Sequence, residues 1–249
     1  MALVCAGAVA FVAFGPLSAA PTPTPTRSVA ATPTPSPTPQ ATRTAAPVDA
    51  VDAPASTTVA AATGAEVPVS AEPGGATTQT LSNPQASGAP LVLRVVDERA
   101  GWVEVQLAQR PNGSTGWVRT SAVTLSEDPY AIVVTRSTNT LDLYRDGKVV
   151  ETYPVATGTG GTPTPTGRYA LTELLAPTNS GYGPYAYGTT AFSDVLNSFG
   201  GGPGQIGLHG TDDKSSIGTA ASHGCIRMHN DDITALAERL PLGTPFQVR

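Results

Sequence analysis

The sequence has very little cysteine, with only Cys5 and Cys225 in 249 residues. Cys5 lies in an apolar stretch, residues 2–20, that carries no charge. We expect residues 1–20 to be either a secretory signal peptide or a membrane anchor. The exported part then holds one cysteine, and that count excludes an internal structural disulfide. A lone thiol outside the reducing cytosol is prone to oxidation, so Cys225 is expected either to do chemistry or to be a buried, inert side chain.

Charge is scarce as well. Charged residues make up 13% of the chain, the net charge is −5, and the basic residues form no cluster. Proteins that bind nucleic acid normally carry a basic patch or stripe. The sequence therefore predicts no nucleic-acid partner.

Aromatic residues are missing from a long N-terminal region, between Phe14 and Trp102. Within this gap, residues 21–89 are dominated by proline, threonine, alanine and serine. A segment of this composition buries too little apolar surface to offset the entropy lost on ordering it. We therefore expect residues 21–89 to be a disordered linker, which leaves about 160 residues to fold.

The first folded segment is predicted to be a small β-module over residues 90–128. It contains Gly-Trp-Val at 101–103 and again at 116–118, with the turn sequence Pro-Asn-Gly at 111–113 between them. Two similar strands around a turn predict a twisted sheet. The segment resembles the Src-homology-type barrels of bacterial wall proteins. Its tryptophans either bind a ligand or, the interpretation we favour, pack in the core.

The second segment, residues 129–249, is rich in strand patterns. An apolar, β-branched run at 130–136 is followed by an alternating pattern around Asp146-Gly147, a strong hairpin signal. Further strands are predicted in GRYALTELL, in GQIGLHG and in the closing PFQV.

One helix is predicted near the C-terminus. Asn230 is its expected N-cap, and Ile233, Leu236 and Leu240 recur at helical spacing before Pro241 ends it. The predicted fold is therefore mostly β, a mixed and sandwich-like sheet with one C-terminal helix and a small β-module before it.

The stretch SHGCIRM surrounds the lone exported cysteine with chemically useful groups. In an extended strand His223, Cys225 and Arg227 share one face, because they are two residues apart. A base from another strand can approach the sulfur end-on, and His209, at the end of an apolar strand, is the natural candidate. The amides of Gly224 and Cys225 could point at a developing oxyanion. This pattern indicates acyl transfer through a thioester.

The combination of IGLHG with SHGCIRM resembles the signature of the L,D-transpeptidase catalytic domain, and the likeness runs from about Tyr130 to Arg249. The resemblance implies Cys225 as nucleophile and His209 as general base. It also implies supporting or substrate-binding roles for five further residues, namely Gly210, whose carbonyl would orient His209, Ser222, His223, Gly224 and Arg227. By the same resemblance, the backbone from His223 to Cys225 would offer the oxyanion donors. Many members of the family have asparagine where this chain has Arg227, so the role of that position stays open.

The resemblance further implies bacterial peptidoglycan stem peptides as partners, with no cofactor and no metal. Cys225 would acylate on the third stem residue, and a neighbouring amine would resolve the thioester into a 3→3 cross-link. Water in its place would make the protein an L,D-carboxypeptidase. Carbapenems are expected to acylate Cys225. The protein would work outside the cytoplasm, at the cell wall, secreted or tethered to the plasma membrane. The acceptor and the oligomeric state stay open.

Other interpretations of the same residues compete with this one. His209 could be a satisfied core histidine and Cys225 an inert core thiol. His209, His223, Cys225 and His229 could form a zinc site, although their spacing fits no common zinc pattern. His229 by itself is expected at the surface or at the helix entry. The whole chain could also be a non-catalytic protein that binds cell wall through its tryptophan-containing module.

Overall fold

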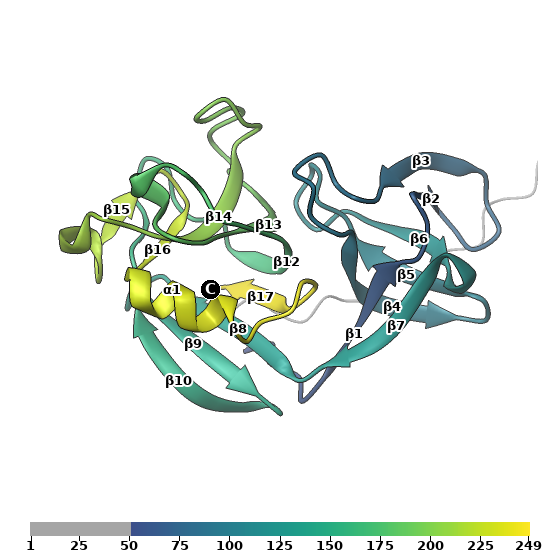
Figure 1. Ribbon diagram of the computed structural model, residues 1–249, viewed down its shortest axis with the longest axis horizontal. Coiled ribbons are helices and arrows are strands. Elements are labelled where there is room, and N and C mark those ends of the chain that lie inside the picture. Colours follow the sequence, from purple (N-terminus) through teal and green to yellow (C-terminus); the bar gives the residue numbers. More distant parts are fainter. Residues whose placement is uncertain (1–50) are drawn as a thin grey trace, which may run out of the picture. The chain divides into compact units, whose positions relative to one another are not determined.

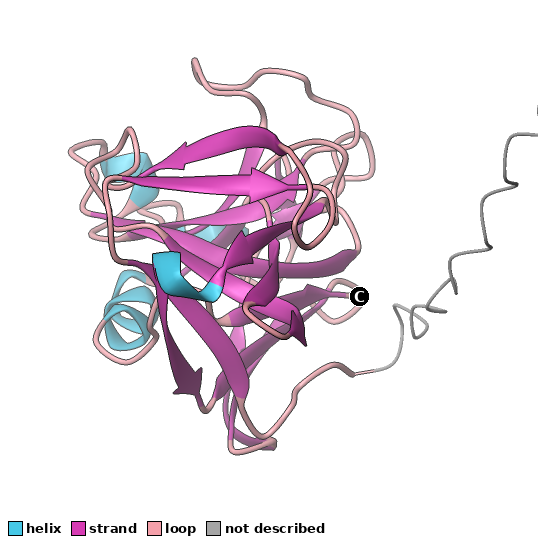
Figure 2. Ribbon diagram, turned by 90° about the vertical axis from the view of Figure 1, so that its right-hand side faces the viewer, coloured by secondary structure: helices cyan, strands magenta, loops and turns pink. Residues whose placement is uncertain are grey.

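The computed structural model describes residues 51–249, which lie within one compact unit, Ala45–Arg249. The expected signal or anchor and residues 21–50 of the expected linker lie outside the described residues. Strands dominate the described part, which has one α-helix and three short 3-10 turns (Figure 2). None of the helices in this part is both long and apolar enough to cross a membrane.

The linker prediction is wrong over residues 57–82, because this region forms three strands of the first sheet. They are β1 (Thr57–Ala62), β2 (Glu66–Ser70) and β3 (Thr77–Ser82). Ala60, Val67 and Val69 are buried in one core with residues from later strands, such as Val103. Alanine, valine and leucine side chains fill this core, so it needs no aromatic residue from the region. Composition alone could not reveal a core that only distant strands complete.

The module is accordingly larger than predicted and ends at Asp128 but begins near Thr57. Its seven strands run in the order β3-β2-β6-β5-β4-β1-β7 (Figure 1). The remaining members are β4 (Val92–Arg99), β5 (Trp102–Gln106), β6 (Thr115–Arg119) and β7 (Val123–Asp128). The Trp117 side chain is buried, whereas Trp102 is half-buried under the Arg119 guanidinium, 4.4 Å from the ring centroid. The packing interpretation therefore fits Trp117 better than Trp102.

The second sheet has eight strands in the order β10-β9-β8-β17-β12-β13-β14-β16. Their bounds are β8 (Tyr130–Thr135), β9 (Thr140–Arg145), β10 (Lys148–Pro154), β12 (Gly167–Leu175), β13 (Ala186–Phe192), β14 (Gln205–Gly210), β16 (Ile226–Met228) and β17 (Pro245–Val248). The pairs β8–β17 and β14–β16 are parallel and the others antiparallel. Both halves of the sheet share one core, so the expected mixed, sandwich-like fold is confirmed. A separate two-stranded pair consists of β11 (Thr157–Gly158) and β15 (Ala220–Ser222).

The predicted hairpin and helix are both present. Asp146 and Gly147 join β9 to β10 with φ angles of 52° and 73°, the left-handed values that a tight two-residue turn requires. The helix α1 (Asn230–Ala237) packs Ile233 and Leu236 into the core of the second sheet. The N-cap prediction is wrong by one residue, since His229 occupies that position and its carbonyl accepts the Ile233 amide at 3.0 Å. His229 thus lies at the helix entry, as expected.

Candidate active site

The parallel pair β14–β16 brings the histidine and the cysteine into one site. Leu208 lies opposite Ile226, and His209 lies opposite Arg227. Cys225 directly precedes β16, and the amide of Gly207 reaches its Sγ at 3.4 Å. The strand register therefore places the thiol beside β14, two residues before His209.

Gly207 keeps the space between the His209 and Cys225 side chains open. A Cβ at this position would lie 3.7 Å from His209 Cδ2 and 3.9 Å from Cys225 Sγ. The imidazole and the thiol therefore converge on the same small volume above Gly207. No imidazole–thiol hydrogen bond forms among the described residues, which is common in sites without bound substrate.

His209 is held as a neutral base with a defined tautomer. Its Nδ1 lies 2.6 Å from the Gly210 carbonyl, which can only accept, so Nδ1 carries the proton and Nε2 keeps its lone pair. The side chain is 4% exposed, and the Tyr182 ring packs on it with centroids 4.6 Å apart. Burial lowers the pKa of His209 to about 4, the Gly210 carbonyl opposes this shift, and the charge of Arg227 adds to it. The imidazole is therefore uncharged at neutral pH.

The thiol of Cys225 is also uncharged at neutral pH. Burial raises its pKa, while the Gly207 amide and the Arg227 guanidinium act in the opposite direction. Arg227 is itself anchored by an ion pair with Asp213 at 3.7 Å. With both groups neutral, the sulfur becomes a strong nucleophile only as its proton moves to His209 Nε2.

A tight turn just before Cys225 is fixed by side-chain hydrogen bonds. Ser222 Oγ donates to the Cys225 carbonyl at 2.6 Å and accepts the Gly224 amide at 3.0 Å. Thr164 Oγ1 donates to the Gly224 carbonyl at 2.8 Å. The prediction that the Gly224 amide serves as an oxyanion donor is therefore wrong, because that amide already binds the Ser222 hydroxyl. The amides of His223 and Cys225 remain the candidates.

We expect Gly224→Ala to lower both stability and reactivity. Gly224 has a φ of 122°, and a Cβ there would lie 2.9 Å from Ile206 Cδ1. Such a strained residue costs about 1–3 kcal/mol, and relief of the strain would displace Cys225. Thermal unfolding and thiol alkylation rates measure the two effects. Gly160→Ala is the matched control, because a Cβ there meets nothing within 4 Å. Equal behaviour of the two variants would contradict the account of this turn.

A pocket of about 200 Å³ opens in front of these groups. It is lined by Gly181, Tyr182, Phe199, His209, Ser222, His223, Cys225 and Arg227. Of the residues predicted from the sequence, five side chains line the pocket, while Gly210 and Gly224 contribute backbone contacts behind it. His223 is exposed, and its ring stacks on Phe199 with centroids 4.9 Å apart. Tyr182 and Phe199 were not predicted from the sequence, and their glycine-rich surroundings were the one available signal.

The four residues of the zinc alternative do not form a metal site in the part of the chain that the structure describes. Within residues 51–249, no three side chains of His, Cys, Asp or Glu lie close enough to hold a metal ion. His229 is at the start of α1 rather than in the pocket beside Cys225.

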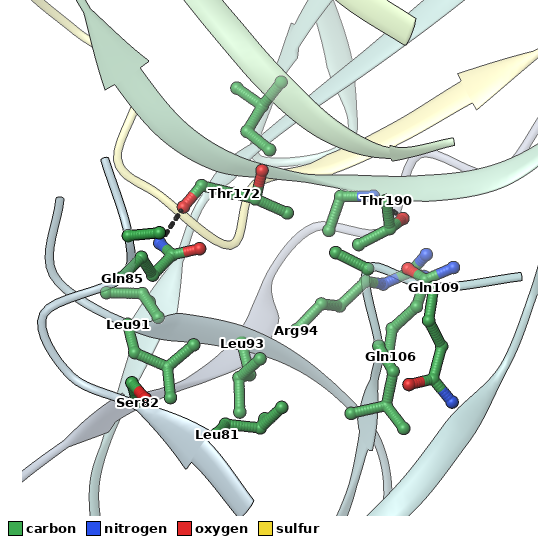
Figure 3. Close-up of a pocket in the computed structure, with 16 residues that line it drawn as sticks. Leu81, Ser82, Gln85, Leu91, Leu93, Arg94, Gln106, Gln109, Thr172 and Thr190 are labelled. Carbon is green, nitrogen blue, oxygen red and sulfur yellow. Dashed lines mark hydrogen bonds between the residues drawn. The ribbon is translucent and has the colours of Figure 1, made fainter. Parts of the chain in front are cut away.

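A second cavity of about 230 Å³ lies between the module and the second sheet (Figure 3). Arg94 and Gln106 face Gln85 and Thr172 across it, and Gln85 Nε2 donates to the Thr172 carbonyl at 2.8 Å. Its lining includes no histidine and no cysteine. We therefore place the candidate chemistry in the pocket beside Cys225.

The lowered pKa of His209 predicts an acid-sensitive fold. A histidine with a pKa near 6.5 when unfolded and about 4 when folded binds more protons in the unfolded chain between these values. Its contribution is therefore fully present above pH 6.5 and is lost as the pH falls through 4, by about 3 kcal/mol. We expect His209→Asn to lose less unfolding free energy than wild type between pH 7 and pH 4. Parallel denaturant curves at the two pH values test this, and identical losses would contradict the burial of a neutral imidazole.

Comparison with known proteins identifies relatives of the second segment. The family model for the L,D-transpeptidase catalytic domain (YkuD) matches residues 129–248. The putative L,D-transpeptidase YkuD of Bacillus licheniformis is 37% identical over 120 residues, which are 48% of this chain and 66% of that protein. The putative L,D-transpeptidase YqjB of Bacillus subtilis is 35% identical over 134 residues, covering 48% of this chain and 70% of that protein.

The matches leave part of each protein outside the comparison. The chain spans less than two thirds of the Bacillus YkuD relatives, 66% of the Bacillus licheniformis protein and 63% of the Bacillus subtilis one. A solved structure of an L,D-transpeptidase from Mycobacterium smegmatis is 17% identical and covers 64% of this chain and 90% of its own length, with a TM-score of 0.39.

Proposed function

This chain belongs to the L,D-transpeptidase family, and on that premise we propose that it forms 3→3 cross-links between peptidoglycan stem peptides through a thioester on Cys225. The observation that carries the proposal is the His209–Gly210 contact at 2.6 Å beside the thiol. It fixes a neutral imidazole with Nε2 available to take a proton. A satisfied core histidine would not need to share a solvent-open pocket with the lone described cysteine.

The first half-reaction acylates the enzyme. Cys225 Sγ attacks the carbonyl carbon of the third stem residue while its proton passes to His209 Nε2. The amides of His223 and Cys225 are our candidates for binding the oxyanion. The bond from that carbonyl to the terminal D-alanine then breaks, and the leaving amine takes the proton from His209. The products are a Cys225 thioester and free D-alanine.

The second half-reaction releases the cysteine. An amine from a neighbouring stem attacks the thioester carbonyl and gives up a proton to His209, which returns it to the departing thiol. The neutral state of His209 suits this shuttle, because it must accept and return one proton in each half-reaction. If water takes the place of the amine, the same site performs an L,D-carboxypeptidase reaction.

Arg227 is assigned a role in holding charge near the thiol. Its guanidinium lines the pocket and opposes the rise that burial causes in the pKa of Cys225, and its ion pair with Asp213 limits its movement. The same guanidinium is suited to bind a carboxylate of the stem peptide. We further propose that the protein acts outside the cytoplasm, because stem peptides lie there. Residues 1–20 would either direct its export or tether it to the membrane.

Product analysis tests the proposed reaction. The protein is incubated with a disaccharide-tetrapeptide, and the products are separated and weighed by mass spectrometry. A cross-linked dimer together with free D-alanine supports transpeptidation. A tripeptide with free D-alanine and no dimer instead supports the carboxypeptidase. Unchanged tetrapeptide, from protein whose thiol still reacts with iodoacetamide, would contradict both and favour a binding protein.

A further inference from the structure

A loop from the second sheet forms one wall of the pocket beside Cys225. Residues 193–204, here called the Phe199 loop, connect β13 to β14. The Phe199 ring stacks on His223 with an interplanar angle of 27° and lines the same pocket as the thiol. The position of this loop therefore decides the shape of the space that a substrate must enter.

Burial does little to hold the Phe199 loop in place. Of its three large apolar side chains, Val195 and Phe199 are 54% and 44% exposed, and Leu196 is half-buried. Inside the loop, Phe199 and Gly202 exchange backbone hydrogen bonds of 3.0 Å, and the Ser193 amide donates to the Gly204 carbonyl at 2.8 Å. These bonds close the loop on itself but do not fix it against the sheet.

Hydrogen bonds from the module hold the Phe199 loop in place. Arg110 lies between β5 and β6, in the turn of the module, and its guanidinium donates to three carbonyls of the loop. The distances are 3.0 Å to Ser193, 2.9 Å to Leu196 and 3.1 Å to Pro203. The three acceptors lie at both ends of the loop, so one planar cation gathers them. The same guanidinium lies 5.0 Å from the centroid of the Phe192 ring.

Asn112 of the same turn holds the start of the loop. Its Nδ2 donates to the Phe192 carbonyl at 2.8 Å, and its Oδ1 accepts the Phe192 amide at 2.8 Å. The side-chain amide thus pairs with the backbone of Phe192 in both directions, as a neighbouring strand would. A further bond of 3.3 Å joins Nδ2 to Asp194 Oδ1.

We propose that the β-module positions the Phe199 loop over Cys225, with Arg110 and Asn112 as positioning residues for the acyl-transfer site. The module then contributes to catalysis without touching the substrate, because it fixes the wall that Phe199 forms. The expected effect on acylation rests on the proposed function. The effect of the module on the position of the loop does not, and it can be measured separately.

The test compares full-length wild type with Arg110→Ala and Asn112→Ala. Hydrogen–deuterium exchange is followed in peptides that cover residues 192–204, and acylation by meropenem is timed by intact mass. We expect faster exchange in this segment and about fivefold slower acylation in Arg110→Ala, mainly through weaker binding of meropenem. The pH profile of acylation should keep its shape, because the charges beside Cys225 are untouched. In Asn112→Ala the exchange of the Phe192 amide should rise most.

Two controls separate positioning from a general loss of structure. Arg119→Ala removes another exposed arginine of the module, one that packs on Trp102 and is not bonded to the loop. It should match wild type in both measurements. Arg110→Lys keeps the charge but loses the guanidinium that binds three carbonyls at once. Faster exchange in residues 192–204 of this variant, with unchanged exchange in β8 and β17, would support the proposal. This variant keeps the test decisive even if Arg110→Ala folds poorly. Phe199→Ala should slow acylation as Arg110→Ala does, and the double variant should be no slower than either.

The outcomes against the proposal are distinct from failure of the proposed function. Wild-type exchange in residues 192–204 of Arg110→Ala and of Arg110→Lys would overturn it, whatever the acylation rates. Faster exchange in these variants together with acylation at the wild-type rate would overturn the link between the loop and the site. Absence of acylation in wild type itself would contradict the proposed function, and the exchange measurement would still decide whether the module holds the loop.

Discussion

Cys225→Ser is expected to lose acylation by meropenem and by a tetrapeptide donor almost completely, by about 10³-fold or more. We propose the thiol as the nucleophile and His209, whose pKa is about 4, as its base. So weak a base can assist a thiol, which loses its proton readily, far better than a hydroxyl. The measurement is the rate of adduct formation by intact mass under identical conditions.

The serine variant is informative because it preserves the surroundings of the sulfur. A hydroxyl still accepts the Gly207 amide, which reaches Sγ at 3.4 Å in the wild type. We expect its unfolding temperature to stay close to that of wild type, so a lost adduct reports chemistry rather than misfolding. Cys225→Ala serves as a second variant. An adduct that forms on Cys225→Ala at the wild-type rate would remove Cys225 from the mechanism.

His209→Ala is expected to slow acylation at neutral pH by about 10²- to 10⁴-fold, the usual range for a general base. The pH profile is the sharper part of this prediction. In wild type a neutral imidazole is present from above pH 4, so the rate should be nearly level through neutrality. Without His209 the reaction depends on free thiolate, whose pKa is raised by burial. The rate of the variant should then climb with pH until it approaches the wild-type rate in alkali.

The neighbouring histidine provides the matched control. His223 also lines the pocket, but its ring is exposed and stacks on Phe199. We expect His223→Ala to change acylation much less than His209→Ala and to keep the level profile of wild type. A level profile in His209→Ala, or a steep one in His223→Ala, would mean that the base has been assigned to the wrong residue.

Local sequence signals predicted a good part of this fold. The Asp146-Gly147 turn and the final helix depend on a few adjacent residues, so their patterns are readable without any knowledge of the rest. Residues 57–82 show the opposite case. Val67 and Val69 bury themselves only because Val103 and other residues far along the chain complete the core. A composition rich in alanine and threonine therefore looked like linker.

The candidate site likewise has parts that local sequence predicts and parts that depend on distant segments. The turn from Ser222 to Cys225 is local, and a parallel strand pair was enough to bring His209 to it. The prediction for the Gly224 amide was wrong because this amide binds the Ser222 hydroxyl. That bond depends on the backbone conformation of Gly224, which the sequence does not reveal. Phe199 and Arg110 escaped notice because their loops meet only after both sheets have formed. Contacts between loops leave no periodic signal in a single sequence.

The most direct test of the central claim is the mass of the enzyme during reaction with a disaccharide-tetrapeptide. The account predicts a transient species heavier than the protein by the donor less D-alanine, with the added mass mapped to Cys225 after proteolysis. The species should decay when an acceptor amine is added. A reaction that consumes tetrapeptide while no acylated Cys225 is ever trapped, under conditions where a meropenem adduct is readily seen, would contradict the thioester mechanism.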